Sequence, residues 1–339
     1  MKIVKLYPEF PFRFRIGVGK MDTIDDLIHS DTLFSAIINC AVKLYSFDEV
    51  NVLIERFIQR RIAISSVFYG VRDKEKEVFF FPKPFGRFSS NESLNIIDKK
   101  KLKNIKYISS DIWTKILSSW DGKKINYNLL EKTALNNGFL FSEGSIELED
   151  EKTEIIKKIF IEPKVQVGRS RATAENLYFQ SEVELLSLSE KTTPFLFLLF
   201  KGEMDKKIKA IFNLLIEEGI GGERASGKGW FKEWDIGEIN LPEPKENDDC
   251  LSLSLTLPAV EEVNYLKSYQ LLTRNGFIYS ATGGVSYRKK TVRLLKEGAI
   301  FVKNIKGQII DVKPEFLKLQ HPVYLYGQSF NIRLGKNEN

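Results

Sequence analysis

The chain has 339 residues, 43% hydrophobic and 28% charged, a composition typical of a globular protein with a substantial core and about two domains. Two cysteines and two histidines exclude a disulfide framework and the usual zinc ligand sets, so we expect no metal, no cofactor and a reducing cytoplasm. The net charge of +6 favours an acidic partner, and no segment has the apolar length of a signal peptide or a membrane span.

The N-terminal residues alternate between strand and helix patterns. Hydropathy with a period of two predicts strands at Lys2–Leu6 and Phe12–Ile16. A helix is predicted from His29 to about Tyr45, with Ser30 or Asp31 as its N-cap. Its apolar stripe consists of Leu33, Phe34, Ile37, Ile38 and Val42. Residues 61–69 and 78–82 then predict an antiparallel strand pair.

The middle of the chain is less regular. Residues 83–158 are rich in Lys, Asn and Ser and predict a large, partly helical insertion without a core of its own. Residues 161–188 alternate as a long protruding hairpin. Within it, Glu175–Ser181 is identical to the site of a widely used tag-removal protease. A site engineered into a flexible loop and a coincidence are both open.

A buried strand at 193–201, a helix at 204–218 and a strand at 230–236 complete an N-terminal unit at 1–240. The order of its elements predicts a ferredoxin-like fold. A linker rich in Pro, Asn and Asp precedes a second unit at 250–334, which begins with a strand of period two. The expected fold class is α+β, with two ferredoxin-like (RRM-like) domains, the first carrying the insertion and the hairpin.

The most distinctive motif is the loop Gly219–Phe231, which holds five glycines and the cations Arg224 and Lys228. Glycine lets a loop adopt positive φ and bring backbone amides close to a phosphate. The spacing resembles a P-loop, but Gly229 replaces the Mg²⁺-binding Ser or Thr, and the loop follows a helix instead of preceding one. We therefore exclude nucleotide hydrolysis and expect RNA-backbone binding, with a simple helix cap as the alternative.

Four motifs together resemble the fourth subunit of the Csm family, a RAMP protein of type III-A CRISPR effector complexes. They are His29–Phe34, the glycine loop, Gly283-Gly284 with 288–290 and 296–298, and His321–Gly327. The resemblance covers about residues 2–334 apart from the insertion. It implies a non-catalytic, cytoplasmic subunit that grips the repeat-derived 5′ tag of the guide RNA (crRNA). It also implies contacts with the large polymerase-like subunit and with the backbone RAMP subunit, and no membrane.

The expected RNA contacts come from the first helix, the hairpin and two glycine loops. Cations there neutralise phosphates and an exposed aromatic ring stacks on a base. The residues are His29, Ser30, Arg169, Arg171, Gly221, Gly222, Arg224, Gly227, Lys228, Gly283, Gly284, Tyr287, Arg288, Lys289 and Lys290.

His29 has a cap or core role as its alternative. A RAMP endoribonuclease with His29 as acid/base, or the equivalent type III-B subunit, are the competing functions. A lone histidine without a second base disfavours the enzyme, and we expect no catalytic residue.

Overall fold

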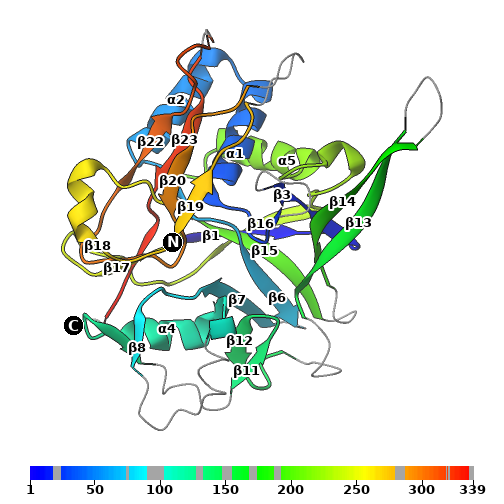
Figure 1. Cartoon of the computed structure of the whole chain (residues 1–339). Helices are drawn as coiled ribbons and strands as arrows, with labels where there is room; N and C mark the ends of the chain where they lie inside the picture. The colour runs from blue at the N-terminus through cyan, green and yellow to red at the C-terminus, as the bar shows by residue number, and fades with distance from the viewer. Residues whose placement is uncertain are drawn as a thin grey trace.

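The structure, a computed structural model, describes residues 1–17, 24–73, 76–89, 103–126, 133–146, 155–167, 174–186, 192–278, 287–317, 319 and 321–335. A large sheet forms the centre of the molecule, with strand order β11-β12-β9-β7-β6-β15-β1-β16 (Figure 1). Its strands are β1 (Lys2–Tyr7), β6 (Phe68–Asp73), β7 (Lys76–Pro82), β9 (Tyr107–Ser109), β11 (Thr133–Asn136), β12 (Phe139–Ser142), β15 (Thr192–Lys201) and β16 (Glu233–Glu238). The short strand β5 (Ala63–Ile64) pairs with β15.

The predicted ferredoxin-like order is present in the centre of this sheet. Neighbouring strands in the order β16-β1-β15-β6 are antiparallel, and the helices α1 (Ser30–Leu44) and α5 (Lys206–Glu218) follow β1 and β15. This is the βαββαβ arrangement. Residues Phe195–Phe200 form a continuous apolar run because β15 lies in the middle of the sheet, where both of its faces are buried.

The start of α1 differs from the prediction. Its N-cap is His29, and no side chain caps the helix, so the predicted capping by Ser30 or Asp31 is wrong. Both residues lie inside the helix and are buried. Most of the predicted apolar stripe packs inward, but Val42 is 60% exposed. A second helix, α2 (Phe47–Ile58), follows directly and is closed by a capping box between Ser46 and Glu49.

The described residues within the segment 83–158 add short strands to the main sheet. β9 pairs with β7 and β12, and α4 (Ser110–Ser118) packs against these strands. The Trp113 ring stacks on Phe81 at 4.5 Å, and Trp113 belongs to the core cluster of the main sheet. The described part of this segment therefore packs into the core of the main sheet, while its interpretation as an insertion without a core of its own stays a prediction. The strands of three or four residues are too short for alternation to reveal them.

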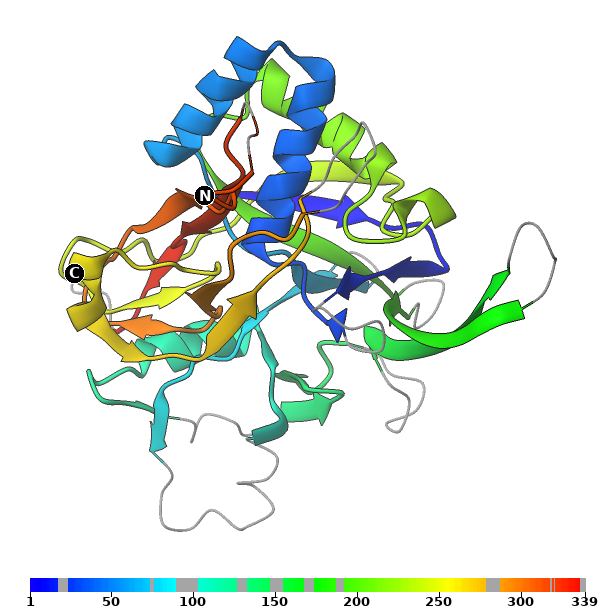
Figure 2. The ribbon, with the colours of Figure 1, turned by 45° about the horizontal axis from the view of Figure 1, so that its top comes forward.

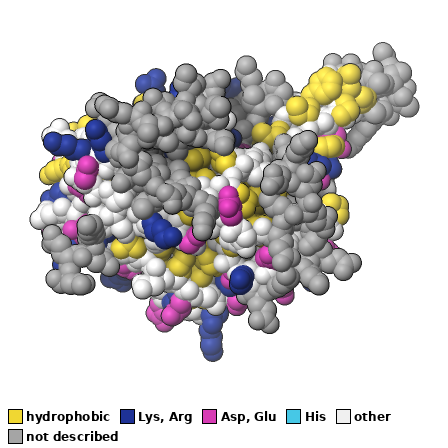
Figure 3. Space-filling view, turned by 90° about the horizontal axis from the view of Figure 1, so that it is seen from below, with side chains coloured by type: hydrophobic (Ala, Val, Ile, Leu, Met, Phe, Trp, Pro, Cys, Tyr) yellow, Lys and Arg dark blue, Asp and Glu magenta, His cyan; other side chains and the backbone are white. Residues whose placement is uncertain are grey.

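The predicted hairpin is present and protrudes from the body (Figures 1 and 2). It consists of the antiparallel strands β13 (Lys157–Val167) and β14 (Ala174–Leu185), and β14 also pairs with β2 (Phe12–Phe14). Glu175–Ser181 therefore lies in a paired strand, not in a loop. One face of the hairpin is apolar and exposed (Figure 3). Its side chains are Ile159, Ile161, Val165, Leu177 and Phe179.

The C-terminal unit consists of small sheets with the orders β18-β21-β17-β24, β19-β20 and β22-β23. The strands are β17 (Cys250–Ser252), β18 (Leu266–Ser268), β19 (Leu271–Arg274), β20 (Val292–Leu295), β21 (Ile300–Phe301), β22 (Gly307–Asp311), β23 (Tyr324–Gln328) and β24 (Asn331–Arg333). Among the described residues after 250, helix is confined to the 3-10 segment η2 (Val260–Tyr265). The expected helix-on-sheet unit therefore takes its helical cover from elsewhere.

That cover comes from the N-terminal helices, which lie beside β22 and β23 in Figure 1. The rings of Phe34 and Phe57 lie 5.3 and 6.1 Å from the ring of Tyr326. Leu251 and Ile332 belong to the same core cluster as the main sheet. The core thus continues across residues 241–249, while the division into domains at 1–240 and 250–334 stays a prediction.

Remaining short strands connect these parts. β3 (Ile16–Gly17) pairs with β4 (Ile24–Asp25), and β8 (Arg87–Ser89) runs parallel to β10 (Lys124–Asn126). The segment at Arg13–Gly17 thus passes from the hairpin sheet to a small ladder next to the start of α1. This path brings two arginines of the segment to the glycine loop.

Candidate RNA-backbone interface

The glycine loop packs closely against the segment at residues 13–17. The amides of Gly222 and Gly229 donate to the backbone oxygens of Arg15 and Arg13, both at 2.8 Å. These two amides are thus bonded within the protein, and their bonds fix the loop beside the segment. The sequence predicted that the loop glycines bind phosphate. In the structure, close packing of the loop against residues 13–17 accounts for several of these glycines.

Individual glycines differ in what they allow. Gly221 has φ 104°, and a Cβ there would lie 2.6 Å from the Arg15 oxygen. Gly229 has φ 74°, and a Cβ would lie 2.2 Å from the Ile220 oxygen. Gly227, at φ 79°, faces open space. Gly222 is outside the positive-φ set, and a Cβ there would make an ordinary 3.6 Å contact. A positive φ therefore explains Gly221, Gly227 and Gly229 but not Gly222.

The two cations of the loop contact carboxylates. Lys228 Nζ binds the buried carboxylate of Glu182 on β14 and lies 3.7 Å from Glu162 on β13. Arg224 Nη1 lies 3.7 Å from Glu218 at the end of α5. Lys228 thus ties the protruding hairpin to the glycine loop. Arg224 is the more accessible of the two, with 29% of its side chain exposed against 13%.

A cavity of about 230 Å³ lies between the glycine loop, the first turn of α1 and the C-terminal unit. Its lining includes three glycines, Gly17, Gly221 and Gly276. Four cations line it, Arg15, Arg274, Lys289 and Lys290, together with a single carboxylate, Asp31. The structure thus brings three predicted site residues, Gly221, Lys289 and Lys290, into one basic cavity.

The charges in this cavity suit an anion. Arg274 grips the Asp31 carboxylate through two contacts, Nε to Oδ2 at 2.9 Å and Nη2 to Oδ1 at 3.1 Å. Burial lowers the pKa of Lys289 because desolvation disfavours its ammonium. Lys290 Nζ lies 3.0 Å from Glu315. Since the cavity lining holds four cations against one carboxylate, a phosphate would be attracted there.

Beside the cavity, residues 276–278 and 287–289 pair as a short antiparallel arm. Arg288 lies opposite Phe277, with its guanidinium carbon 5.4 Å from the ring centroid. Tyr287 makes an edge contact with Phe316, with ring centroids 6.2 Å apart. Arg288 therefore projects on the other face of the arm from its neighbours Tyr287 and Lys289.

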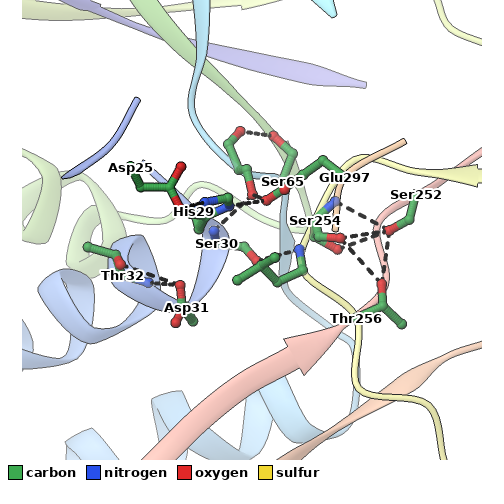
Figure 4. A network of polar contacts seen from close by, with 12 residues as sticks. Asp25, His29, Ser30, Asp31, Thr32, Ser65, Ser252, Ser254, Thr256 and Glu297 are labelled. Carbon is green, nitrogen blue, oxygen red and sulfur yellow. Dashed lines mark hydrogen bonds and ion pairs between the residues drawn. The ribbon is translucent and has the colours of Figure 1, made fainter. Parts of the chain in front are cut away.

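His29 lies in a buried polar network that joins the two units (Figure 4). Its Nδ1 lies 2.7 Å from Glu297 Oε1, and its Nε2 lies 2.7 Å from Asp25 Oδ2. Burial alone would lower the pKa of His29, but the charges and hydrogen bonds of Glu297 and Asp25 raise it to about 9. The imidazole is therefore a buried cation at neutral pH, held between two carboxylates.

Ser30 belongs to the same network. Its amide donates to Ser66 Oγ at 2.9 Å, and its Oγ accepts from the Leu255 amide at 3.1 Å. Ser66 in turn donates to Glu297. Because the His29 and Ser30 side chains are fully buried with protein partners, their geometry supports the core interpretation over RNA contact, and we leave them out of the proposed RNA surface.

The remaining predictions divide by location. Arg169, Arg171, Gly283 and Gly284 lie outside the described residues. Sequence reasoning missed Arg15 and Arg274 as part of the site. Their sequence context offered one weak signal, a cation next to a glycine: Arg15 precedes Gly17 by two residues, as Arg274 precedes Gly276.

The part of the chain that the structure describes contains no group of three or more His, Cys, Asp or Glu side chains arranged to hold a metal ion. None of the described helices has the length and apolar character needed to cross a membrane.

Comparison with known sequences shows a consistent relationship. Residues 245–334 match the model of the CRISPR Csm4 C-terminal domain. The chain is 28% identical over 378 aligned positions to the CRISPR system Csm4 protein of Methanocaldococcus jannaschii, covering 97% of this chain and 96% of that protein. It is 25% identical over 330 positions to the Csm4 protein of Streptococcus thermophilus, covering 94% of each.

Solved structures share the fold. A chain of the crystal structure of the Csm3-Csm4 subcomplex in the type III-A CRISPR-Cas interference complex aligns with a TM-score of 0.67 and 22% identity, covering 99% of this chain and all of that one. A chain of the Csm1-Csm4 cassette in complex with cA4 aligns with a TM-score of 0.58 and 20% identity, covering 100% and 99%. The chain therefore belongs to the Csm4 family of type III-A CRISPR effector subunits.

Proposed function

We propose that this chain is the non-catalytic subunit that binds the repeat-derived 5′ tag of the guide RNA and links the large subunit, Csm1, to the backbone subunit, Csm3. Family membership supports the proposal, as do the related structures, which are complexes of Csm4 with Csm3 and with Csm1. The two-domain RAMP architecture, with ferredoxin-like units at 1–240 and 250–334, is part of this proposal. The observation that carries RNA binding is the basic cavity beside the glycine loop.

The cavity presents positive charge, and the described residues that line it show no set of hydrogen-bonding groups arranged to distinguish one base from another. Arg15, Arg274 and Lys289 approach it from three separate segments, so a phosphate there would bridge both units of the protein. Backbone phosphates are recognised by charge, and such contacts position a nucleic acid without specifying its sequence. We therefore assign this cavity to the sugar-phosphate backbone of the tag.

The geometry of His29 supports a non-catalytic role. A general acid or base for RNA cleavage needs a ring nitrogen within hydrogen-bond reach of the reacting hydroxyl. Both nitrogens of His29 are engaged by Glu297 and Asp25, and the side chain is buried. We expect repeat RNA to stay intact on incubation with the purified protein. Site-specific cleavage lost in His29→Ala would instead support the endoribonuclease alternative.

The decisive experiment is a binding titration over a salt series with tag RNA and a scrambled RNA of equal length. Lys289→Gln removes one cation of the cavity. It should weaken binding to both RNAs by similar factors and flatten the slope of log affinity against log salt by about 0.7. Lys207→Gln is the matched control, because Lys207 pairs with Glu49 on α2, outside the cavity. Equal behaviour of the two variants would remove the cavity from the RNA path.

A second experiment tests the assembly. Co-expression with Csm1 and Csm3, followed by size-exclusion chromatography, should give a complex that contains all three proteins and bound RNA. A stable monomer that ignores both partners at micromolar concentration would contradict the linking role.

A further inference from the structure

We propose that Tyr287 and Phe316 form a base-stacking site next to the basic cavity, so that one unpaired nucleotide places its base on these rings while an adjoining phosphate enters the cavity at Lys289. The inference rests on the proposed RNA binding and deepens it. It names where a base is held, in addition to where the backbone is held.

The pairing of the arm decides which side chains face the cavity. The Lys289 amide donates to the Gly276 oxygen at 2.7 Å, and the Ile278 amide donates to the Tyr287 oxygen at 2.8 Å. Side chains alternate along an extended strand, so Tyr287 and Lys289 project from one face and Arg288 from the other. Two residues of extended chain span about 6.8 Å, which places Tyr287 within one nucleotide of Lys289.

The two rings lie at an angle and are open to solvent. Their planes meet at 61°, with centroids 6.2 Å apart, and the exposed fractions are 38% for Tyr287 and 76% for Phe316. Rings exposed to this extent leave apolar surface in contact with water, and a flat nucleobase stacked on them would cover that surface. The edge contact with Phe316 orients the Tyr287 ring, and the exposed part of that ring is available for a base to stack on.

The surrounding charges favour RNA over a protein partner. Lys290 forms an ion pair with Glu315, the residue directly before Phe316 in the chain. Lys289 lines the cavity and projects from the same face of the arm as Tyr287. Aromatic rings interleaved with cations are the composition of single-strand binding surfaces. The exposed apolar surface of the hairpin is largely aliphatic and does not share this arrangement.

The test uses single-stranded RNAs that carry 2-aminopurine at one position, scanned along the strand. Stacking quenches its fluorescence, so the wild-type protein should quench it at one position. The double variant Tyr287→Leu, Phe316→Leu should lose this quenching and bind about tenfold more weakly. Its salt slope should stay unchanged, since no charge is removed.

The chain offers a matched control in Phe277→Leu. Phe277 is an exposed aromatic of the same arm, 57% accessible, but it lies on the other face beneath Arg288. This variant should keep both quenching and affinity. Thermal unfolding of all variants establishes that each is folded.

Several outcomes would overturn the proposal. Quenching retained in the double variant, or lost equally in Phe277→Leu, places the base elsewhere. Unchanged RNA binding with lost association with Csm1 or Csm3 assigns the rings to a protein interface. RNA that binds with the predicted salt dependence but shows no quenched position contradicts only the stacking site. Absence of RNA binding by the wild-type protein would contradict the proposed function as well.

Discussion

The imidazole of His29 lies 2.7 Å from the carboxylate of Glu297, although 268 residues separate them in the chain. His29 precedes α1, and Glu297 follows β20 in the C-terminal unit. Both side chains are buried. An unpaired charge in a protein interior is strongly destabilising, and the Glu297 carboxylate of the C-terminal unit is paired with His29 of the N-terminal unit, which also contacts Asp25. The two units are therefore bound to each other electrostatically as well as through their common core.

This pair makes stability depend on pH. The pKa of His29 is raised from 6.5 to about 9 in the folded protein. A raised pKa stabilises the fold below about pH 6.5, and this contribution, about 3 kcal/mol at most, disappears as pH rises through about 9. We expect the free energy of unfolding in urea to fall across this range.

Glu297→Gln isolates the source of this effect. The variant leaves His29 with Asp25 as its carboxylate partner, so the pKa of His29 drops and the loss of stability moves to lower pH. Glu315→Gln changes an exposed carboxylate and should reproduce the wild-type profile. Parallel pH profiles for wild type and Glu297→Gln would contradict the assignment.

Two glycines of the loop should respond differently to alanine. Gly227→Ala faces open space and should destabilise by about 1 kcal/mol, the strain of a left-handed backbone. Gly229→Ala adds a clash with the Ile220 oxygen and should destabilise by at least about 3 kcal/mol. Equilibrium unfolding of both variants measures the difference. Similar values would mean that the loop relaxes between Ile220 and Gly229 and so avoids the clash.

Lys228 and Arg224 should separate stability from RNA binding. Lys228→Met leaves the buried Glu182 carboxylate with the more distant Lys164, at 3.9 Å, as its cationic partner and should destabilise by about 3 kcal/mol, with an unchanged salt slope of RNA binding. Arg224→Met should alter stability by less than about 1 kcal/mol, because its pair with Glu218 is partly exposed. If Arg224 contacts a phosphate, its salt slope should flatten by about 0.7. A flatter salt slope with unchanged stability in Lys228→Met would instead show that Lys228 contacts RNA and does not tie the loop to the hairpin.

The folded protein should resist the tag-removal protease at Glu175–Ser181. Gln180 and Ser181 are buried, and both pair with β13. A protease needs an extended, accessible segment, which this strand provides only after local unfolding. The same seven residues appended after Asn339 serve as the positive control on an electrophoresis gel. Internal cleavage as fast as removal of the appended segment would show that the hairpin opens readily.

Long periodic elements were predictable because burial leaves a regular mark on them. The strand at β15 and the helix at α5 follow their hydropathy patterns within two residues of the observed ends. The helix α2 carried a readable signal that was missed, since Val50, Leu53, Ile54 and Phe57 recur at helical spacing after a capping box.

The site was less predictable because it is assembled by tertiary packing. Arg15 comes from a part of the chain far from the paired segments that carry Arg274 and Lys289, and only the fold brings the three to one cavity. His29 could be recognised as a residue at a helix start, but its carboxylate partners lie on other segments. The local sequence shows which side chains are present, whereas the neighbours of each side chain depend on long-range contacts.

The contact of Phe34 and Phe57 with Tyr326 also has a consequence during synthesis. At ribosomal rates of about 5–20 residues per second, roughly 15–60 s pass between the emergence of Phe34 and that of Tyr326. Throughout this interval the first two helices expose the surface that β23 later covers. The nascent chain thus completes this part of its core only after Tyr326 has emerged, and yield in a heterologous host should rise with chaperones that bind apolar nascent segments.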